Sequence, residues 1–321
     1  MIWDDSRYRR QLDLTRPCGA RITDAFLGGC HNFGVEREFV ERAERRIPGI
    51  TTTMRESRAF LRRAVDHSLA SGIRQFIDLG SGLPTVGHIH EIAGRLTSDY
   101  RVVYVDNEPL TAAHGARLLT DEPNTALLHE DCREIDSVLA APELRRLIDL
   151  SEPVALVLTG VVHSLPESSD PRSLVSSYRR RLASGSHLVL AHLTDSVQPE
   201  RARTLQRLYA ESSDPVFARG TGWIDTLFGD FEILDPGTGP LAAWRPEPRE
   251  TGDTERCRML YGGIGRKREP AEGVSATTGS VGTPHGGAAP HDPQRNGGEQ
   301  GHHPSGGPRL GQSGVRGHHP E

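Results

Sequence analysis

The chain has 321 residues and a formal net charge of −5, with 43 acidic against 38 basic side chains. This length fits two average domains or one α/β domain with extensions, and the mildly acidic balance argues against a nucleic-acid-binding protein. The sequence has no run of about eighteen apolar residues and no apolar signal core near its N-terminus, so we expect a cytoplasmic protein without a membrane span.

The chain up to about residue 70 is predicted to be helical. Within Met54–Ala70, apolar residues recur every four positions at Leu61, Val65 and Leu69, which indicates an amphipathic helix. Val35–Arg46 is predicted to be a second, more polar helix that is ended by Pro48-Gly49.

From residue 73 onward, short apolar strands alternate with helices. This order is typical of a parallel, doubly wound sheet, whose right-handed crossovers place helices on both faces. Near the end, Phe231–Leu234 and Cys257–Gly263 are strand-like with no helix between them, which indicates a hairpin-like antiparallel edge. The other predicted strands are Ile73–Leu79, Arg101–Asp106, Thr125–Glu130, Val154–Thr159 and Ser186–His192, and the predicted helices are Thr85–Leu96, Pro109–Leu119, Arg133–Leu147 and Pro171–Leu182.

The composition changes sharply near Arg266. Beyond this point Gly and Pro make up 20 of 56 residues and no Phe, Trp or Tyr occurs, so little apolar surface is available to offset the entropy cost of ordering. We therefore predict a helical extension at 1–72 that contributes to the active site, a ligand-binding α/β domain at 73–265 and a disordered tail at 266–321. The four Cys form no CxxC pair and the six His of the tail are scattered, so we expect no metal site.

The most informative segment is the turn after the first strand, Asp78-Leu79-Gly80-Ser81-Gly82. Glycine has no Cβ and tolerates positive φ, so such a turn lets a ligand approach the backbone at the carboxyl end of a strand. A dinucleotide fingerprint would be G-x-G-x-x-G/A, whereas here the third small position is Thr85, and Pro84 removes an N–H that a pyrophosphate would use. The turn alone is therefore weak evidence for any one ligand.

Acidic residues follow the first three strands, at Asp78, Asp106 and Asp131, and should share one rim of the sheet. Asp106 could accept hydrogen bonds from two adjacent ribose hydroxyls. Asp131 and the backbone of Cys132 could contact the amino group of a purine, and Asp78 could bind a cation. Together with the glycine turn, these acids favour a ligand with an adenosine and a positive centre but no pyrophosphate, namely S-adenosyl-L-methionine.

Several segments between Thr15 and about Lys267 also carry a family resemblance. They are Arg21–Phe33 (RITDAFLGGCHNF), Phe76–Thr85 (FIDLGSGLPT), Val102–Pro109 (VVYVDNEP), Leu158–His163 (LTGVVH) and Trp244-Arg245-Pro246. With these segments the chain resembles a family of bacterial S-adenosyl-L-methionine-dependent methyltransferases, found mainly in actinobacteria and long classed as a domain of unknown function. The resemblance implies the class I methyltransferase fold, a seven-stranded, mostly parallel sheet with an antiparallel last strand. It does not imply a substrate.

The acids and the resemblance together predict the cofactor site. The predicted cofactor-binding residues are Asp78, Gly80, Ser81, Gly82, Leu83, Pro84, Asp106, Asn107, Asp131, Cys132, Thr159 and Gly160. His163 follows the fourth strand, where the methyl group of a class I enzyme would point. It could be a general base that takes a proton from a substrate hydroxyl or amine, or a hydrogen-bonded wall of the cofactor pocket.

The polar segment Arg21–Phe33 is predicted to lie over the cofactor and to form part of the substrate pocket. The predicted substrate contacts are Arg21, Asp24, His31, Asn32 and Phe33. Relatives tend to have a Lys-Asp pair where this chain has Cys30-His31, so its substrate choice could differ. The alternative interpretation is a packing segment with a capped turn.

The expected reaction is methyl transfer to the oxygen or nitrogen of a small-molecule acceptor, by in-line displacement that needs alignment more than a metal. No basic surface interleaved with aromatic residues indicates a nucleic-acid substrate. One alternative is a regulatory module that binds S-adenosylmethionine without turnover. A less favoured alternative is an NAD-linked oxidoreductase, against which the missing third glycine and the antiparallel edge argue.

Overall fold

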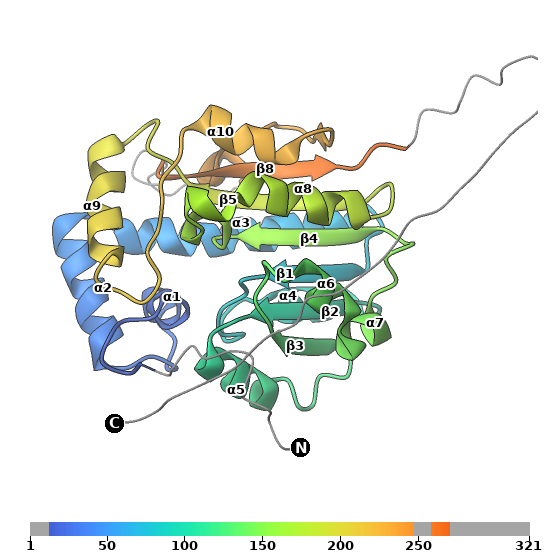
Figure 1. Cartoon of the computed structure of the whole chain (residues 1–321), viewed down its shortest axis with the longest axis horizontal. Helices are drawn as coiled ribbons and strands as arrows, with labels where there is room; N and C mark the ends of the chain where they lie inside the picture. Colours follow the sequence, from blue (N-terminus) through green and yellow to red (C-terminus); the bar gives the residue numbers. More distant parts are fainter. Residues whose placement is uncertain (1–12, 247–257, 270–321) are drawn as a thin grey trace, which may run out of the picture. The chain divides into compact units, whose positions relative to one another are not determined.

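A mostly parallel β-sheet forms the centre of the described residues, 13–246 and 258–269 (Figure 1). In this computed structural model the strand order is β3-β2-β1-β4-β5-β8-β6, and β7 pairs with β8. The strands are β1 (Gln75–Leu79), β2 (Arg101–Asp106), β3 (Thr125–His129), β4 (Val154–Thr159), β5 (His187–Leu193), β6 (Glu232–Ile233), β7 (Gly239–Pro240) and β8 (Leu260–Arg266). Strands β1 to β5 pair in parallel, whereas β8 runs antiparallel to β5, β6 and β7.

This sheet confirms the predicted doubly wound class. The predicted antiparallel edge is also confirmed, because β8 and β6 pair antiparallel as the last two strands of the sheet, and β8 joins this edge to β5. The two-residue strand β7 adds an eighth strand to the seven that were expected. Cys257, at the start of one predicted strand, and residues 270–321 of the predicted tail lie outside the described residues.

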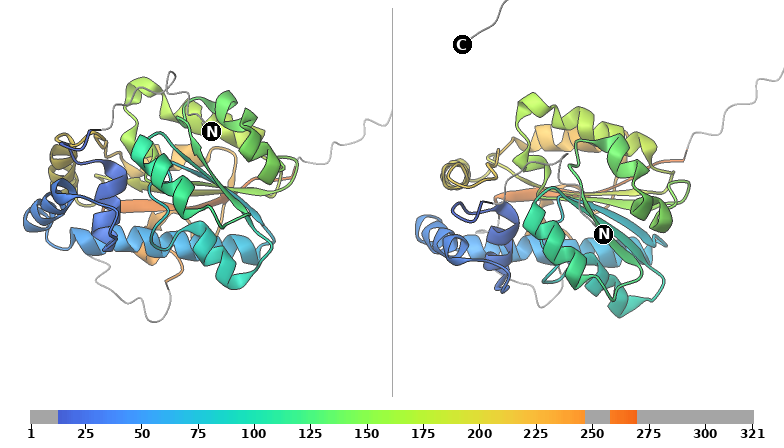
Figure 2. Two further views of the ribbon diagram at one scale, coloured as in Figure 1. Left: turned by 90° about the horizontal axis from the view of Figure 1, so that it is seen from below. Right: turned by 60° about the horizontal axis from the view of Figure 1, so that its bottom comes forward.

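Helices cover both faces of the sheet. They are α1 (Gly19–Leu27), α2 (Gly34–Arg46), α3 (Ile50–Ala70), α4 (Ile89–Leu96), α5 (Pro109–Leu118), α6 (Ile135–Ala140), α7 (Pro142–Leu147), α8 (Pro171–Arg181), α9 (Pro199–Tyr209) and α10 (Thr221–Asp225). Alternate residues of each strand enter different apolar layers, for example Phe76 with α3 and α4, and Ile77 with α6, α7, α8 and α10. Figure 2 shows α3, in blue, crossing one face, while α1, α2 and α9 gather at one end of it.

Two local differences from the predicted elements have physical causes. The predicted helix Thr85–Leu96 begins only at Ile89, after a turn in which Gly87 has a φ of +63°. Pro142 divides the predicted helix Arg133–Leu147 into α6 and α7, because proline lacks the N–H and clashes with the preceding helical turn. Helices α9 and α10 were not predicted. None of the described helices is both long and apolar enough to cross a membrane.

Candidate functional site

A cavity of about 630 Å³ lies where the parallel strands end. Asp78 is the next-to-last residue of β1, Asp106 ends β2 and Thr159 ends β4. Residues of α1 and α3 also line the cavity. Its lining includes the predicted residues Asp78, Gly80, Ser81, Gly82, Leu83, Asp106, Asn107, Asp131, Cys132, Thr159, Gly160 and His163. Pro84 lies outside the lining and packs toward Gly115 of α5. The structure therefore brings nearly all the predicted cofactor residues into one cavity.

Glycine is required in the turn after β1. Gly80 and Gly82 both have a φ of +66°, and a Cβ on Gly80 would lie 2.5 Å from the Cβ of Val161. The N–H of Gly80 donates to the carbonyl of Val105 at 2.7 Å, and the N–H of Gly82 donates to Oδ2 of Asp106 at 2.8 Å. These bonds fix the turn against β2, so its backbone is held in place for a ligand.

The two strand-end acids Asp78 and Asp106 are buried and carry raised pKa values. Burial raises the pKa of Asp78 to about 7, although the nearby Arg58 opposes the rise. Burial also raises the pKa of Asp106 to about 6, with backbone N–H groups of Glu108 and Gly82 opposing it. Asp78 is only 2% exposed, and its Oδ1 has no hydrogen-bond partner.

A buried carboxylate oxygen without a donor costs free energy, so Asp78 is a site for a ligand that brings a donor or a positive charge. Within the described part of the chain, no three His, Cys, Asp or Glu side chains are grouped to hold a metal ion. The donor set and the glycine turn thus fit the adenosine and the ammonium group of S-adenosylmethionine.

The carboxylate of Asp131 is less available to a ligand than its position in the sequence indicates. Its carboxylate accepts hydrogen bonds from the backbone N–H and the guanidinium of Arg133, the shortest at 2.5 Å, and one from Asn107 at 3.3 Å. The carbonyl of the neighbouring Cys132 accepts the hydroxyl of Tyr178 at 2.8 Å. Contact with a purine would therefore use the remaining lone pairs of Asp131 or the backbone N–H of Cys132.

The imidazole of His163 is held as a hydrogen-bond donor. Its Nδ1 accepts the backbone N–H of Leu193 at 3.3 Å, which assigns the ring proton to Nε2. Burial, together with the positive charge of Arg219, lowers its pKa to about 4, so the ring is neutral near pH 7. A general base needs a free lone pair and a pKa near the working pH, and this arrangement supplies neither.

Arg21, at the start of the segment Arg21–Phe33, belongs to a buried ion-pair network. Arg21 is 1% exposed, and its guanidinium donates to Glu36 at 2.9 Å and to Glu108 at 3.2 Å. The other carboxylate oxygen of Glu36 accepts the N–H of Phe33 at 2.9 Å. Neither Arg21 nor Phe33 lines the cavity. Arg21 thus links α1 to α2 and to the loop after β2.

Asp24 holds the later part of this segment through the hydrogen bonds that it accepts. It accepts the N–H of His31 at 2.8 Å, the amide of Asn32 at 2.8 Å and the hydroxyl of Thr85 at 2.7 Å. A Cβ on Gly29 would lie 2.1 Å from Oδ1 of Asp24, so glycine is needed there. Asp24 lines the cavity, but His31 and Asn32 do not. The arrangement has the features of the alternative interpretation, a packed turn that here is tied to the glycine-rich loop.

Two groups of lining residues were missed from the sequence. Helix α3 contributes Met54, Ser57, Arg58 and Leu61, and the chain around the end of α9 contributes Leu205, Tyr209, Ser213, Asp214 and Val216. The first group could have been predicted from helical spacing in the sequence, because Arg58 lies three residues before Leu61 and so on the same helical face. The second group had no such signal, since it reaches the site through contacts with a segment almost 200 residues earlier, such as the hydrogen bond from the N–H of Gly19 to Asp214 at 2.8 Å.

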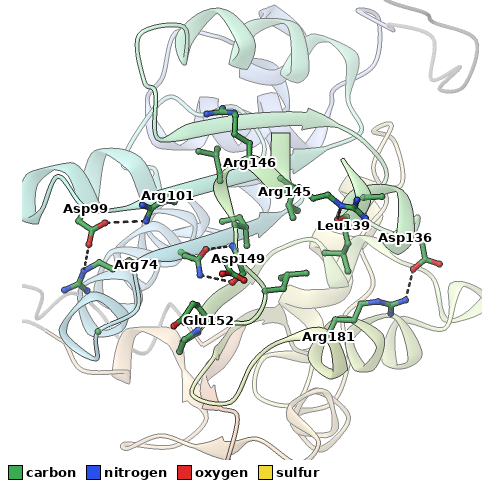
Figure 3. Close-up of a pocket in the computed structure, with 18 residues that line it drawn as sticks. Arg74, Asp99, Arg101, Asp136, Leu139, Arg145, Arg146, Asp149, Glu152 and Arg181 are labelled. Atoms are coloured by element: carbon green, nitrogen blue, oxygen red, sulfur yellow. Dashed lines mark hydrogen bonds and ion pairs between the residues drawn. The ribbon is translucent and has the colours of Figure 1, made fainter. Parts of the chain in front are cut away.

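A larger depression, of about 1130 Å³, lies at the opposite ends of the strands (Figure 3). Several of its charged side chains pair with one another, as in Arg101 with Asp99 at 3.4 Å and Arg181 with Asp136 at 2.6 Å. Among the described residues, none that lines it has a buried side-chain polar atom without a hydrogen bond. The smaller cavity, with its unpaired buried acid, is therefore the candidate site.

Comparisons with known proteins identify a matching family and similar solved structures. The family described as S-adenosyl methyltransferase matches residues 5–268. The crystal structure of a candidate methyltransferase from Thermobifida fusca is 38% identical, has a TM-score of 0.74, and aligns with 84% of this chain and 100% of its own. A DUF574 family protein from Streptomyces avermitilis is 33% identical, with a TM-score of 0.76, over 79% of this chain and 99% of its own. None of the curated proteins matches the sequence.

Proposed function

The chain belongs to the S-adenosyl methyltransferase family, and we propose that it methylates an oxygen or nitrogen atom of a small-molecule acceptor. The family match confirms the resemblance, the class I fold and the cofactor that were predicted from the sequence. It also removes the basis for an NAD-linked oxidoreductase. The observation that carries the acceptor class is the size of the cavity. About 630 Å³ must hold both cofactor and acceptor, which is the range of small-molecule sites.

The chain's own residues divide the work of holding the cofactor. Asp106, whose position is fixed by the N–H groups of Gly82 and Glu108, would accept hydrogen bonds from the ribose. The loop at Asp131 would contact the adenine, and Asp78 would attract the positive charge. The bound cofactor supplies a methyl group on a sulfonium that is already activated for displacement.

The acceptor side of the cavity would exclude water and align the nucleophile. Apolar side chains of Met54 and Leu61 from α3, and of Leu205 and Val216, line this side. Alignment of the two reactants can supply a large part of the reduction in the activation barrier for methyl transfer. A shaped apolar wall that aligns them can therefore suffice for catalysis. His163 would donate its Nε2–H to the acceptor and would not remove a proton. An acceptor that meets this site must therefore bring an available lone pair, as an amine or an ionised oxygen does.

The proposal is tested by incubating the full chain with methyl-labelled cofactor and an actinobacterial cell extract separated by size. We expect label in the low-molecular-mass fraction, and its loss with Asp106→Ala. Label that entered only protein or nucleic acid would contradict the acceptor class. Tight cofactor binding with no label in any fraction would favour the regulatory module.

A further inference from the structure

We propose that Arg58 of α3 binds the carboxylate of the cofactor's amino-acid part, next to Asp78, which binds its ammonium group. The inference rests on the proposed function, since it concerns the same cavity. It names a contact for the carboxylate at the end of the cofactor opposite the adenine, which neither the sequence motifs nor the relatives assigned.

A guanidinium and a carboxylate line this cavity without pairing. Arg58 and Asp78 both belong to its lining, and Oδ1 of the buried Asp78 has no hydrogen-bond partner. In the described part of the chain, Arg58 also makes no hydrogen bond or ion pair within 4.0 Å. If Arg58 served only to neutralise Asp78, the two side chains would be expected to form such a pair. Both groups therefore remain available to a ligand.

The stem of Arg58 is held in position by its neighbours. A Cβ on Gly87 would lie 3.3 Å from Cγ of Arg58 and 3.4 Å from its Cδ, so glycine at this position leaves room for the stem. Met54 and Leu61 lie on the same side of α3 and also line the cavity. Burial raises the pKa of Asp78, and the positive charge of Arg58 acts in the opposite direction. The guanidinium is thus presented beside the acid and within the cavity.

The chemistry of the two groups selects the ligand. A guanidinium is planar and matches a carboxylate through two parallel hydrogen bonds, and a carboxylate attracts an ammonium. An α-amino acid carries both charges on one carbon, so it complements adjacent Arg and Asp side chains. A phosphate would also suit Arg58, but Asp78 would repel it. The observations therefore favour the amino-acid end of the cofactor.

Binding of two ligands to the full chain tests this assignment without an acceptor. S-adenosylhomocysteine has both the carboxylate and the ammonium, whereas its decarboxylated analogue keeps only the ammonium. Measured by isothermal titration calorimetry, Arg58→Met should weaken the binding of S-adenosylhomocysteine about 10- to 100-fold, which is the range for hydrogen bonds to a charged group. The affinity for the analogue should be nearly unchanged. Both ligands retain the ammonium, so any effect of the substitution on Asp78 cancels in the ratio of affinities.

Arg55→Met is the matched control, because Arg55 is exposed, lies about one turn earlier on α3 and is not in the cavity lining. It should change neither affinity. Arg58→Lys keeps the charge but not the paired geometry, and it replaces Arg58→Met if that variant does not fold. Equal weakening of both ligands, or no weakening of either, would overturn the assignment. Selective weakening together with absent methyl transfer would support Arg58 and count against the proposed function instead.

Discussion

Replacing Asp78 by asparagine should stabilise the cofactor-free protein at alkaline pH and weaken cofactor binding. Burial raises the pKa of Asp78 from 3.8 to about 7 in the folded protein. A carboxyl group with a raised folded-state pKa holds its proton more tightly when folded. Its ionisation therefore lowers folding stability as pH rises from about 3.8 to about 7, and the full loss persists above that range. Asparagine cannot ionise and escapes this loss.

The magnitude follows from the pKa. At about 1.36 kcal/mol for each pKa unit, the rise from 3.8 to about 7 corresponds to about 4 kcal/mol at pH 8. At pH 5 only about 1.5 kcal/mol of this has been lost. The cost of burying the polar amide is similar at both pH values and cancels in the comparison. Asp78→Asn should thus gain about 2 to 3 kcal/mol relative to the wild type between pH 5 and pH 8.

Urea denaturation without cofactor at both pH values measures this gain, and calorimetry at pH 8 measures the accompanying loss of S-adenosylhomocysteine affinity. Asp131→Asn is a control of opposite sign. Although burial opposes it, hydrogen bonds from Arg133 lower the pKa of Asp131, so its ionised form stabilises the fold above about pH 3.8. That variant should lose up to about 1 kcal/mol at pH 8. If Asp78→Asn changed stability equally at pH 5 and pH 8, the reasoning would be refuted.

Three further predictions address the other parts of the site. His163→Gln keeps an N–H and should retain methyl transfer with the wild-type pH profile, whereas His163→Phe should slow it about 10-fold or more; a limb near pH 6.5 that disappears in the Gln variant would instead reveal a base. Thr85→Val removes the 2.7 Å bond to Asp24 and should lower the free energy of unfolding by about 1 to 3 kcal/mol in urea, with little change in cofactor affinity. The reverse pattern would support a ligand-binding role for Asp24. Asp106→Asn should weaken S-adenosylhomocysteine binding about 10-fold or more by calorimetry, and unchanged affinity would exclude the ribose contact.

The sheet and the cofactor rim were predictable because their signals are local. A parallel strand buried on both faces is a continuous apolar run, and β2 and β4 have the bounds that such runs predicted. The acids that follow these runs share one rim through topology alone, so Asp78 and Asp106 were found without coordinates. The insertion of β8 between β5 and β6 depends on pairing across the whole domain, which no local pattern records.

The roles of His163 and of the Arg21–Phe33 segment could not be predicted for a related reason. A polar side chain in a glycine-rich segment resembles a ligand contact until its protein partners are known. For Asp24 the decisive partner is Thr85, which lies 61 residues later. For His163 it is the N–H of Leu193, 30 residues later, which decides the tautomer and therefore whether the ring can accept a proton.

The buried acids at the rim connect the instability of the empty site to its choice of ligand. Ionisation of Asp78 and Asp106 costs free energy, because burial removes water from both carboxyl groups and raises the pKa of each above 3.8. The same low effective dielectric strengthens their attraction for a positive charge in the cavity. The site should therefore hold the positively charged cofactor more tightly than the neutral thioether product, with the difference falling below about pH 6 as the acids become protonated. Comparison of the two affinities at pH 5 and pH 8 would measure this contribution directly. A ratio of affinities that did not change with pH would show that the two acids do not distinguish the cofactor from its product.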